Sequence, residues 1–243
     1  MQLLIKLPTR QRPQKALDLT EKYIEMISGN RMVYFVISTH ANDATMNTTE
    51  VNDRVVELAK LAADKNVRLT HVRHDGTTKV HAYNSDPHVD QWDIQIATSD
   101  DMVPLIQGYD EQIVAAMSAR FPNTKGVIHF NDGFSKLMTL PIVGRGWYDQ
   151  FGYIYNPEYT SLFCDNEMEE VAKRLGQYHY EPRLIIRHEH PIHVHKPYDA
   201  LMKHTESFYD ADQAIFRARK RKQFGLKFSA GRWIVHPPRQ VSQ

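Results

Sequence analysis

Short apolar runs alternate with segments of helical periodicity through the first hundred residues. The run 32–38 is continuously apolar, as in a strand buried on both faces of a parallel sheet. Strands are also predicted at 3–7 and 67–72, and at 92–98, where apolar Trp92, Ile94 and Ile96 alternate with other residues. Between them, segments 14–27 and 52–65 place apolar residues three and four positions apart, which predicts amphipathic helices. The alternation predicts an α/β fold with a mostly parallel, Rossmann-like central sheet flanked by helices.

The second half of the chain is less regular. Helices are expected at 110–120, 165–175 and 210–224, and strands at 126–130, 137–143 and 183–187. Pro8 is expected to end the first strand, and Gly144-Arg145-Gly146 to open a loop. No repeat, low-complexity tract or clear linker is visible, so residues 1–243 are interpreted as a single domain.

Composition narrows the class of protein. A hydrophobic fraction of 42% and a charged fraction of 24% are ordinary for a globular domain, and a net charge of +1 gives no reason to expect a nucleic-acid partner. The single cysteine, Cys164, excludes an intrachain disulfide and indicates a reducing compartment. The first residues do not resemble a signal peptide, and no apolar run approaches the roughly 18 residues of a membrane span. We therefore expect a cytoplasmic location.

Two adjacent aspartates, Asp100 and Asp101, follow the predicted strand 92–98. Ligands of open α/β sheets usually bind at the carboxyl ends of the strands. Neighbouring carboxylates repel each other, and a hard divalent cation that carries a diphosphate would neutralise them. Helix capping or a solvated turn is the alternative interpretation.

Several segments, in this order, resemble glycosyltransferases of the GT-A fold that use nucleotide sugars, particularly the large and mostly inverting family 2. Leu7-Pro8-Thr9-Arg10-Gln11-Arg12-Pro13 looks like the Pro-Thr-Arg-x-Arg-Pro start of that family, and Thr98-Ser99-Asp100-Asp101 stands where the family carries its Asp-x-Asp motif. Phe163-Cys164-Asp165-Asn166-Glu167-Met168 resembles its acidic segment, typically Glu-Asp-x-Glu. Here Thr98 or Ser99 replaces the first aspartate of the Asp-x-Asp motif, and Cys164 replaces the glutamate before Asp165.

The resemblance implies a metal-dependent enzyme that moves a sugar from a nucleoside diphosphate donor to an acceptor hydroxyl, with inversion at the anomeric carbon. It implies Mn²⁺ or Mg²⁺ as the cofactor, and it leaves open whether the acceptor is a glycan, a lipid-linked molecule or a protein. Residues 1–104 would form the nucleotide-binding half, 105–200 the acceptor and catalytic half, and 201–243 a C-terminal helical extension.

The resemblance also assigns candidate residues to the donor. Thr9 and Arg10, after the first strand, would contact the nucleobase and a phosphate, because the guanidinium fork of arginine suits a diphosphate; a solvated loop is the alternative. Asp43 would accept a hydrogen bond from the base, although it also suits a simple turn. Lys79 and Asn84 stand where the family has residues near the diphosphate, with a solvated helix turn as the alternative.

The acidic residues divide between metal binding and catalysis. Asp101 is the preferred metal ligand, and Asp100 would bind either the metal or the ribose. Asp165 would act as the general base that removes the proton from the acceptor hydroxyl. Its alternative role is the N-cap of the predicted helix 165–175.

Histidines and aromatic residues supply the remaining candidates. The segment 187–196 holds His188, His190, His193 and His195; His188 or His190 would complete the metal shell, whereas ordinary hydrogen-bonded histidines are the alternative. Four histidines also allow a zinc site, although Pro191 interrupts the segment. Trp147 would present an aromatic face to the acceptor, with core packing as its alternative.

Two other classes of function remain open at this point. The chain is alternatively a non-catalytic module of the same fold that binds a nucleotide sugar or a glycan. A metal-dependent nucleotidyltransferase is the weaker alternative, because that class normally opens with a glycine-rich loop after the first strand, and Leu7-Pro8-Thr9-Arg10 contains no glycine.

Overall fold

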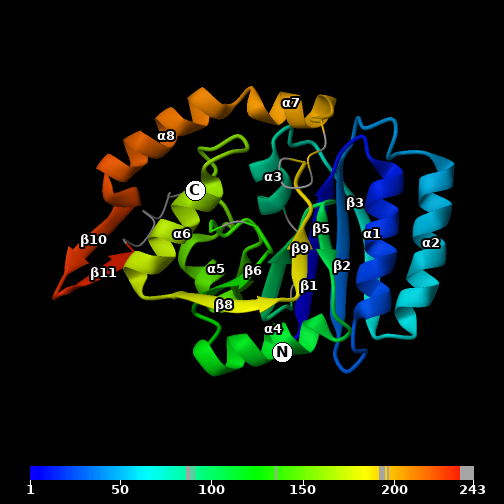
Figure 1. The fold of residues 1–243 in the computed structure, drawn as a ribbon, viewed down its shortest axis with the longest axis horizontal. Helices are drawn as coiled ribbons and strands as arrows, with labels where there is room; N and C mark the ends of the chain where they lie inside the picture. The colour runs from blue at the N-terminus through cyan, green and yellow to red at the C-terminus, as the bar shows by residue number, and fades with distance from the viewer. Residues whose placement is uncertain (86–88, 90, 135, 192–194, 196, 236–243) are drawn as a thin grey trace, which may run out of the picture.

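A seven-stranded mixed sheet forms the centre of the computed structural model, which describes residues 1–235 except 86–88, 90, 135, 192–194 and 196 (Figure 1). The strand order is β3-β2-β1-β4-β7-β6-β8, and β7 is antiparallel to both of its neighbours, β4 and β6, whereas the other pairs are parallel. The strands are β1 (Leu3–Thr9), β2 (Val33–His40), β3 (Val67–His74), β4 (Ile94–Ala97), β6 (Val127–Asn131), β7 (Ile142–Gly144) and β8 (Tyr178–Leu184). The predicted α/β class and mostly parallel sheet are confirmed.

Helices cover both faces of this sheet. They are α1 (Pro13–Met26), α2 (Thr49–Ala63), α3 (Lys79–Asn84), α4 (Tyr109–Arg120), α5 (Arg145–Phe151), α6 (Cys164–Leu175), α7 (Ala200–Glu206) and α8 (Tyr209–Arg221). Two short antiparallel pairs lie outside the main sheet: β5 (Met102–Pro104) with β9 (Ile186–His188), and β10 (Leu226–Ser229) with β11 (Arg232–Val235). A 3₁₀ turn, η1 (Gln223–Gly225), precedes β10. Among the described residues, no helix is long and apolar enough to cross a membrane.

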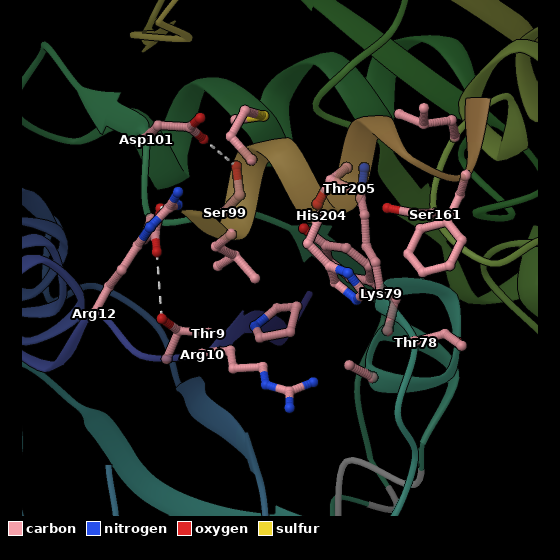
Figure 2. A pocket seen from close by; sticks show the side chains of 18 of the residues that line it. Thr9, Arg10, Arg12, Thr78, Lys79, Ser99, Asp101, Ser161, His204 and Thr205 are labelled. Carbon is pink, nitrogen blue, oxygen red and sulfur yellow. Dashed lines mark hydrogen bonds and ion pairs between the residues drawn. The ribbon is translucent and has the colours of Figure 1, made fainter. Parts of the chain in front are cut away.

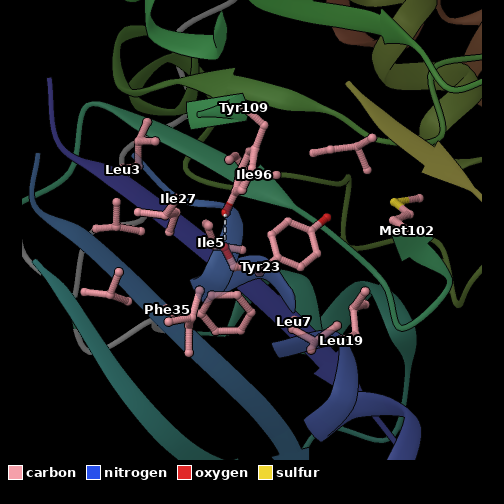
Figure 3. Packing of buried hydrophobic residues seen from close by; sticks show 14 of the residues in the cluster. Leu3, Ile5, Leu7, Leu19, Tyr23, Ile27, Phe35, Ile96, Met102 and Tyr109 are labelled. Atoms are coloured by element: carbon pink, nitrogen blue, oxygen red, sulfur yellow. Dashed lines mark hydrogen bonds between the residues drawn. The ribbon is translucent and has the colours of Figure 1, made fainter. Parts of the chain in front are cut away.

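The core is divided by the sheet because side chains of a strand alternate between its faces. Leu3, Ile5 and Leu7 of β1 pack into the larger cluster with side chains of α1, α2 and α4 (Figure 3). Leu4, between them, packs on the opposite face with Trp92. The smaller cluster on that side joins α3, α5 and α6 with the turn before β10. Both faces are therefore buried, which explains the continuous apolar runs.

Pro8 does not end the first strand, contrary to the sequence prediction. β1 continues to Thr9, and Pro8 pairs with Ser38 of β2. On its other side β1 pairs with β4 only as far as Lys6, opposite Ala97. Beyond Lys6 the strand has one neighbour in the sheet, so the missing N–H of Pro8 is tolerated there as it is on an edge strand.

Two further predictions in the second half of the chain were wrong. Only Ile142–Gly144 of the expected strand 137–143 is extended, and the segment before it is a loop in which the Met138 backbone N–H donates to the carboxylate of Glu169. Gly144-Arg145-Gly146 does not open a loop, because Arg145 begins α5. A Cβ at Gly144 would lie 1.9 Å from the carbonyl oxygen of Thr124, so glycine is required for this close packing.

The C-terminal segment runs along one side of the molecule. Figure 1 shows α7 and α8 extending from above α3 to beyond α6, and the β10–β11 hairpin folding back beside α6. Arg219 of α8 donates to both carboxylate oxygens of Glu167 in α6, at 2.7 and 2.9 Å. Within the described residues 200–235, the C-terminal segment therefore contains α7, α8, the turn η1 and the β10–β11 hairpin, and it packs on α6.

Candidate functional site

A cavity of about 330 Å³ lies where β1, β2, β3 and β4 end (Figure 2). This is the edge at which the sequence placed the ligand, because parallel strands direct their carboxyl ends to the same side. Loops after β1 and β4, the start of α3, the loop before α6, β9 and α7 form its walls. Eight of the predicted site residues line it: Thr9, Arg10, Lys79, Asp100, Asp101, Asp165, His188 and His190.

Asp101 and His188 are brought together by the β5–β9 pair. Met102, the residue after Asp101, stands opposite His188 in this pair, and the Glu189 backbone N–H donates to the Asp101 carbonyl oxygen at 2.7 Å. The Asp101 carboxylate oxygen Oδ2 lies 3.5 Å from Nε2 of His188. Both side chains are buried, so two residues 87 positions apart in the sequence share one polar site beneath the cavity.

A second carboxylate lies on the other side of the His188 ring. Asp132 follows β6, and its Oδ2 is 3.8 Å from Nδ1 of His188. Its carboxylate also accepts hydrogen bonds from the Phe134 backbone N–H and the Thr139 hydroxyl, at 2.9 and 2.8 Å. Burial alone would lower the pKa of His188, but the two carboxylates outweigh burial and raise it to about 9.

The contact between Asp101 and His188, which raises the pKa of His188, lowers the pKa of Asp101. Burial would raise the pKa of Asp101, but the hydrogen bond and the charge of His188, together with the Ser99 hydroxyl, hold it well below the ordinary value. The Ser99 hydroxyl donates to Oδ1 of Asp101. Asp101 is therefore an ionised carboxylate at the cavity wall.

Asp100 faces a different set of partners. Its carboxylate accepts hydrogen bonds from the Arg12 guanidinium at 2.9 Å, the Lys15 ammonium at 3.1 Å and the Thr9 hydroxyl at 3.3 Å. Arg12 also binds Asp199, which caps α7 by accepting from the Met202 backbone N–H. Two cations thus balance Asp100 within the protein, whereas Asp101 is balanced by a single histidine.

Lys79 approaches the cavity from the side opposite Arg10 and Arg12, and Asp165 also lines the cavity. Figure 2 shows Lys79 and Thr78, at the start of α3, across the cavity from these arginines. Burial opposes the charge of Lys79, but neighbouring acidic groups led by Cys164 and Asp165 outweigh it and raise its pKa. Burial also raises the pKa of Asp165, and the charge of Lys79 offsets only part of that effect.

Asp165 does not cap its helix. Phe163 occupies the cap position of α6 with a φ of 60°, and Asp165 is the second helical residue. Its Oδ1 accepts a hydrogen bond from the Asn166 backbone N–H at 2.9 Å. The side chain therefore lines the cavity from the first turn of the helix, where the amides at the helix N-terminus stabilise its charge.

Three candidates from the sequence lie away from the cavity lining. Asp43 is buried, and its Oδ1 accepts hydrogen bonds from Thr45 and Met46 in the loop after β2, whereas its Oδ2 accepts from the Gln11 backbone N–H in the loop after β1. Asn84 accepts from the Ile154 and Tyr155 backbone N–H groups and donates to the Tyr155 carbonyl oxygen.

Trp147 is the third such residue. Only 2% of it is exposed, and it packs in the smaller core cluster against Phe151 at a ring separation of 4.7 Å. In this structure Asp43 is a turn residue and Trp147 a core residue, as in their alternative interpretations, whereas Asn84 is hydrogen-bonded to the 154–155 backbone rather than exposed in a solvated helix turn. Ligand-binding roles for these three residues stay predictions.

The donor set fits a divalent cation held at Asp101 and His188. Among the described residues no group of three or more histidine, cysteine, aspartate or glutamate side chains is arranged to hold a metal. The candidate donors at this point of the cavity are one carboxylate and one imidazole. Metal-binding histidines usually have their second ring nitrogen directed at a carboxylate, as Nδ1 of His188 is directed at Asp132. A carboxylate with an imidazole suits Mn²⁺ better than Mg²⁺, which prefers oxygen ligands alone. His190 packs edge-on against His188 at 5.4 Å, whereas His193 lies outside the described residues.

Several residues of the site were not singled out from the sequence. Asp132 follows β6 directly, and the rule that identified Asp100 and Asp101 at a strand end would also have identified it. Arg12 lies within the opening motif that was recognised, but its pairing with Asp100 depends on tertiary contacts. His40 and His74, at the ends of β2 and β3, line the cavity with ring centroids 6.0 Å apart. The wall formed by α7 was not predicted at all.

Neither a protein-family model nor the sequence of a curated protein matches this chain. The fold, by contrast, matches solved structures. Glucosyl-3-phosphoglycerate synthase from Mycobacterium tuberculosis, in complex with Mn²⁺, UDP and phosphoglyceric acid, superposes with a TM-score of 0.55 at 12% identity, over 97% of this chain and 87% of that one. The mannosyltransferase PcManGT from Pyrobaculum calidifontis, in complex with GDP-Man and Mn²⁺, gives 0.54 at 13% identity, over 75% of this chain and 54% of that one.

A fragment of S. aureus TarS in complex with UDP-GlcNAc gives a TM-score of 0.53 at 11% identity, over 77% of this chain and 58% of the fragment. The present chain thus spans about half of the mannosyltransferase and 37% of a longer TarS structure. These likenesses establish the fold alone: the protein has a GT-A-like fold, as these solved structures do.

Proposed function

We propose that this protein is a metal-dependent glycosyltransferase that moves a sugar from a nucleoside diphosphate donor to an acceptor hydroxyl with inversion. The observation that carries the proposal is the convergence on one cavity of Asp101 and His188, Lys79, and Asp165. A carboxylate–imidazole pair, a cation and a second carboxylate are the groups that transfer from a diphosphate requires. The likeness to structures described as holding Mn²⁺ with a nucleotide or a nucleotide sugar supports the same assignment.

The donor would lie along the ends of the strands. Thr9 and Arg10 follow β1 at the cavity, and Arg10 would pair with a phosphate through its guanidinium. Asp101 and His188 would hold Mn²⁺ or Mg²⁺, and the bound ion would neutralise the charge that builds on the departing diphosphate. We assign the metal to Asp101 rather than Asp100, because Arg12 and Lys15 already compensate Asp100.

Asp165 would act on the acceptor. The acceptor oxygen attacks the anomeric carbon on the face opposite the diphosphate, so the new carbon–oxygen bond forms as the bond to phosphate breaks. The hydroxyl proton passes to the Asp165 carboxylate, and the raised pKa of this group makes it a stronger base than an ordinary aspartate. Lys79, across the cavity from Arg10, would pair with the negative charge of the diphosphate.

The experiment that tests this function is incubation of the purified protein with Mn²⁺ and a panel of nucleotide sugars. Release of the nucleoside diphosphate by transfer or slow hydrolysis, lost in Asp165→Asn, is the expected result. The absence of hydrolysis, transfer and binding for every donor would reject the proposal.

A nucleotide-sugar or glycan-binding module without catalysis is the second candidate. Two observations favour this candidate, because each removes a free carboxylate from the site. Arg12 and Lys15 form ion pairs with Asp100, and the buried Cys164 stands in place of the family's glutamate. Tight, metal-dependent donor binding without any release of nucleoside diphosphate would distinguish this candidate from the enzyme.

A further inference from the structure

Asp212 of α8 is a fully buried carboxylate whose oxygens are held by backbone amides. It accepts hydrogen bonds from three consecutive N–H groups, those of Thr160 at 2.9 Å, Ser161 at 2.8 Å and Leu162 at 2.7 Å. Hydrogen bonds to an ionised acceptor are about twice as strong as neutral ones, and burial makes their loss costly. The C-terminal segment is therefore bound to the 160–162 loop through the hydrogen bonds of the Asp212 carboxylate.

This loop belongs to the candidate site. Ser161 and Leu162 line the cavity, and the chain then passes through Phe163 to Asp165 in the first turn of α6. The carbonyl oxygen of Thr160 accepts a hydrogen bond from the Val80 backbone N–H, which follows Lys79 in α3. The loop held by Asp212 thus adjoins both the proposed base and the proposed diphosphate-binding lysine.

Further contacts with α8 fix the same segment. The ring of Phe163 packs against Tyr209 and Phe216, at centroid separations of 5.1 and 5.8 Å. Phe163 adopts a φ of 60°, a conformation that residues other than glycine rarely adopt, so surrounding contacts must hold it there. Arg219 secures the next turn of α6 through Glu167.

We propose that Asp212 is a positioning residue for the transfer reaction: by binding the three amides of 160–162 it sets Asp165 in line with the acceptor hydroxyl. This role rests on the proposed glycosyltransferase function. The proposed role makes the C-terminal helices a component of the active site. Helix α7 forms one wall of the cavity, and α8 holds the loop 160–162, which leads into the helix that carries the base Asp165.

The test compares Asp212→Asn with Asp210→Asn, a matched control on the same helix. Asp210 is exposed, so its substitution removes one negative charge from α8 without touching the loop. Asparagine at 212 keeps one acceptor oxygen but directs an N–H₂ group toward backbone donors. We expect kcat to fall roughly 100-fold in Asp212→Asn, the effect of misplacing a reacting group by about 1 Å, with donor Kd and binding stoichiometry unchanged. Asp210→Asn should match the wild type.

A double-mutant cycle separates positioning from a general loss of structure. If Asp212 acts through Asp165, the Asp165→Asn/Asp212→Asn double variant loses no more activity than Asp165→Asn alone. A double variant whose loss of activity is the product of the two single losses would overturn the proposal. A loss of kcat in Asp210→Asn equal to that in Asp212→Asn would also overturn it.

Amide hydrogen exchange on the wild-type protein covers the case in which Asp212→Asn does not fold. The amides of Ser161 and Leu162 should exchange far more slowly than in an unstructured peptide, and exchange at the free-peptide rate would overturn the proposal. A wild-type protein that neither binds nor turns over any donor would overturn the glycosyltransferase function itself. An active wild type with an undisturbed Asp212→Asn variant would overturn only the positioning role.

Discussion

Asp101 and His188 lie with a carboxylate oxygen 3.5 Å from an imidazole nitrogen, although 87 positions separate them in the sequence. The short β5–β9 pair creates this relationship, because it sets the end of the segment after β4 against the end of β9. The pair joins the sheet edge that would bind a nucleotide to the second half of the chain, which supplies Asp132 and Asp165.

Substitution of either member of this pair should weaken metal binding. We expect Asp101→Asn and His188→Ala each to weaken Mn²⁺ binding by at least about 10-fold, because each removes one of the two ligands of the proposed metal site. Mn²⁺ titration followed by electron paramagnetic resonance measures the change. Asp53→Asn, which alters an exposed carboxylate on α2, is the control. Unchanged Mn²⁺ affinity in both variants would place the metal elsewhere.

Asp132 should contribute to Mn²⁺ affinity by orienting His188, without contacting the ion itself. Its Oδ2 is directed at Nδ1 of His188, and loss of such a carboxylate typically weakens metal binding or activity about 10–100-fold. We expect Asp132→Asn to lower Mn²⁺ affinity within this range while the protein stays folded, as circular dichroism would report. Mn²⁺ affinity equal to that of the wild type would show that Asp132 does not orient the ring.

Asp165→Asn should lower kcat about 10²- to 10⁴-fold, the usual contribution of a general base, and leave donor binding intact. Because burial raises the pKa of Asp165, activity should fall as pH decreases through a value above the ordinary aspartate pKa of about 3.9. A pH–rate profile of kcat measures this acid limb. An acid limb that persists in the residual activity of Asp165→Asn would assign it to another group.

The same raised pKa has a consequence for stability. The folded state binds the Asp165 proton more tightly than the unfolded state does, so stability falls as pH rises between the two pKa values, and above both the ionised group destabilises the fold. Asparagine does not titrate. We therefore expect Asp165→Asn to have a higher Tm than the wild type at pH 7, with the difference shrinking toward about pH 3.9. A lower Tm at pH 7 would contradict this.

Trp147 should behave as a core residue. Because it is almost fully buried, Trp147→Ala is expected to reduce the free energy of unfolding by about 3–5 kcal/mol in urea denaturation. The milder Trp147→Phe should keep the KM for the acceptor. A large rise in acceptor KM with unchanged stability in Trp147→Phe would restore the sequence-based role.

Local patterns predicted the fold well where burial imposes a clear period. The runs that form β1, β2 and β4 and the helices α1 and α2 were recognised within a few residues, because strands buried on both faces are largely apolar. β3 was also recognised, although only Val67 of its residues is buried. The β5–β9 pair and α7 were missed. Each β strand of that pair has three residues, and α7 buries none of its residues, so neither imposes a hydrophobic period on the sequence.

The site was predictable where strand ends define it and less so where side chains meet through the fold. Asp100, Asp101 and Thr9 follow strands, and they do line the cavity. Asp43 also follows a strand, but its two oxygens accept hydrogen bonds from the loop after β1 and from its own loop after β2. Asp212 could not be found from sequence, because its partners lie about 50 residues away and are backbone amides, which no residue type marks.

Calorimetric titration of UDP-, GDP-, CDP- and dTDP-sugars, with and without Mn²⁺, into the wild type and Asp101→Asn tests the central claim most directly. The account predicts that at least one donor binds the wild type, that binding strengthens with Mn²⁺, and that Asp101→Asn loses the Mn²⁺-dependent part. Binding of no donor, or donor binding that neither Mn²⁺ nor Asp101→Asn alters, would contradict it.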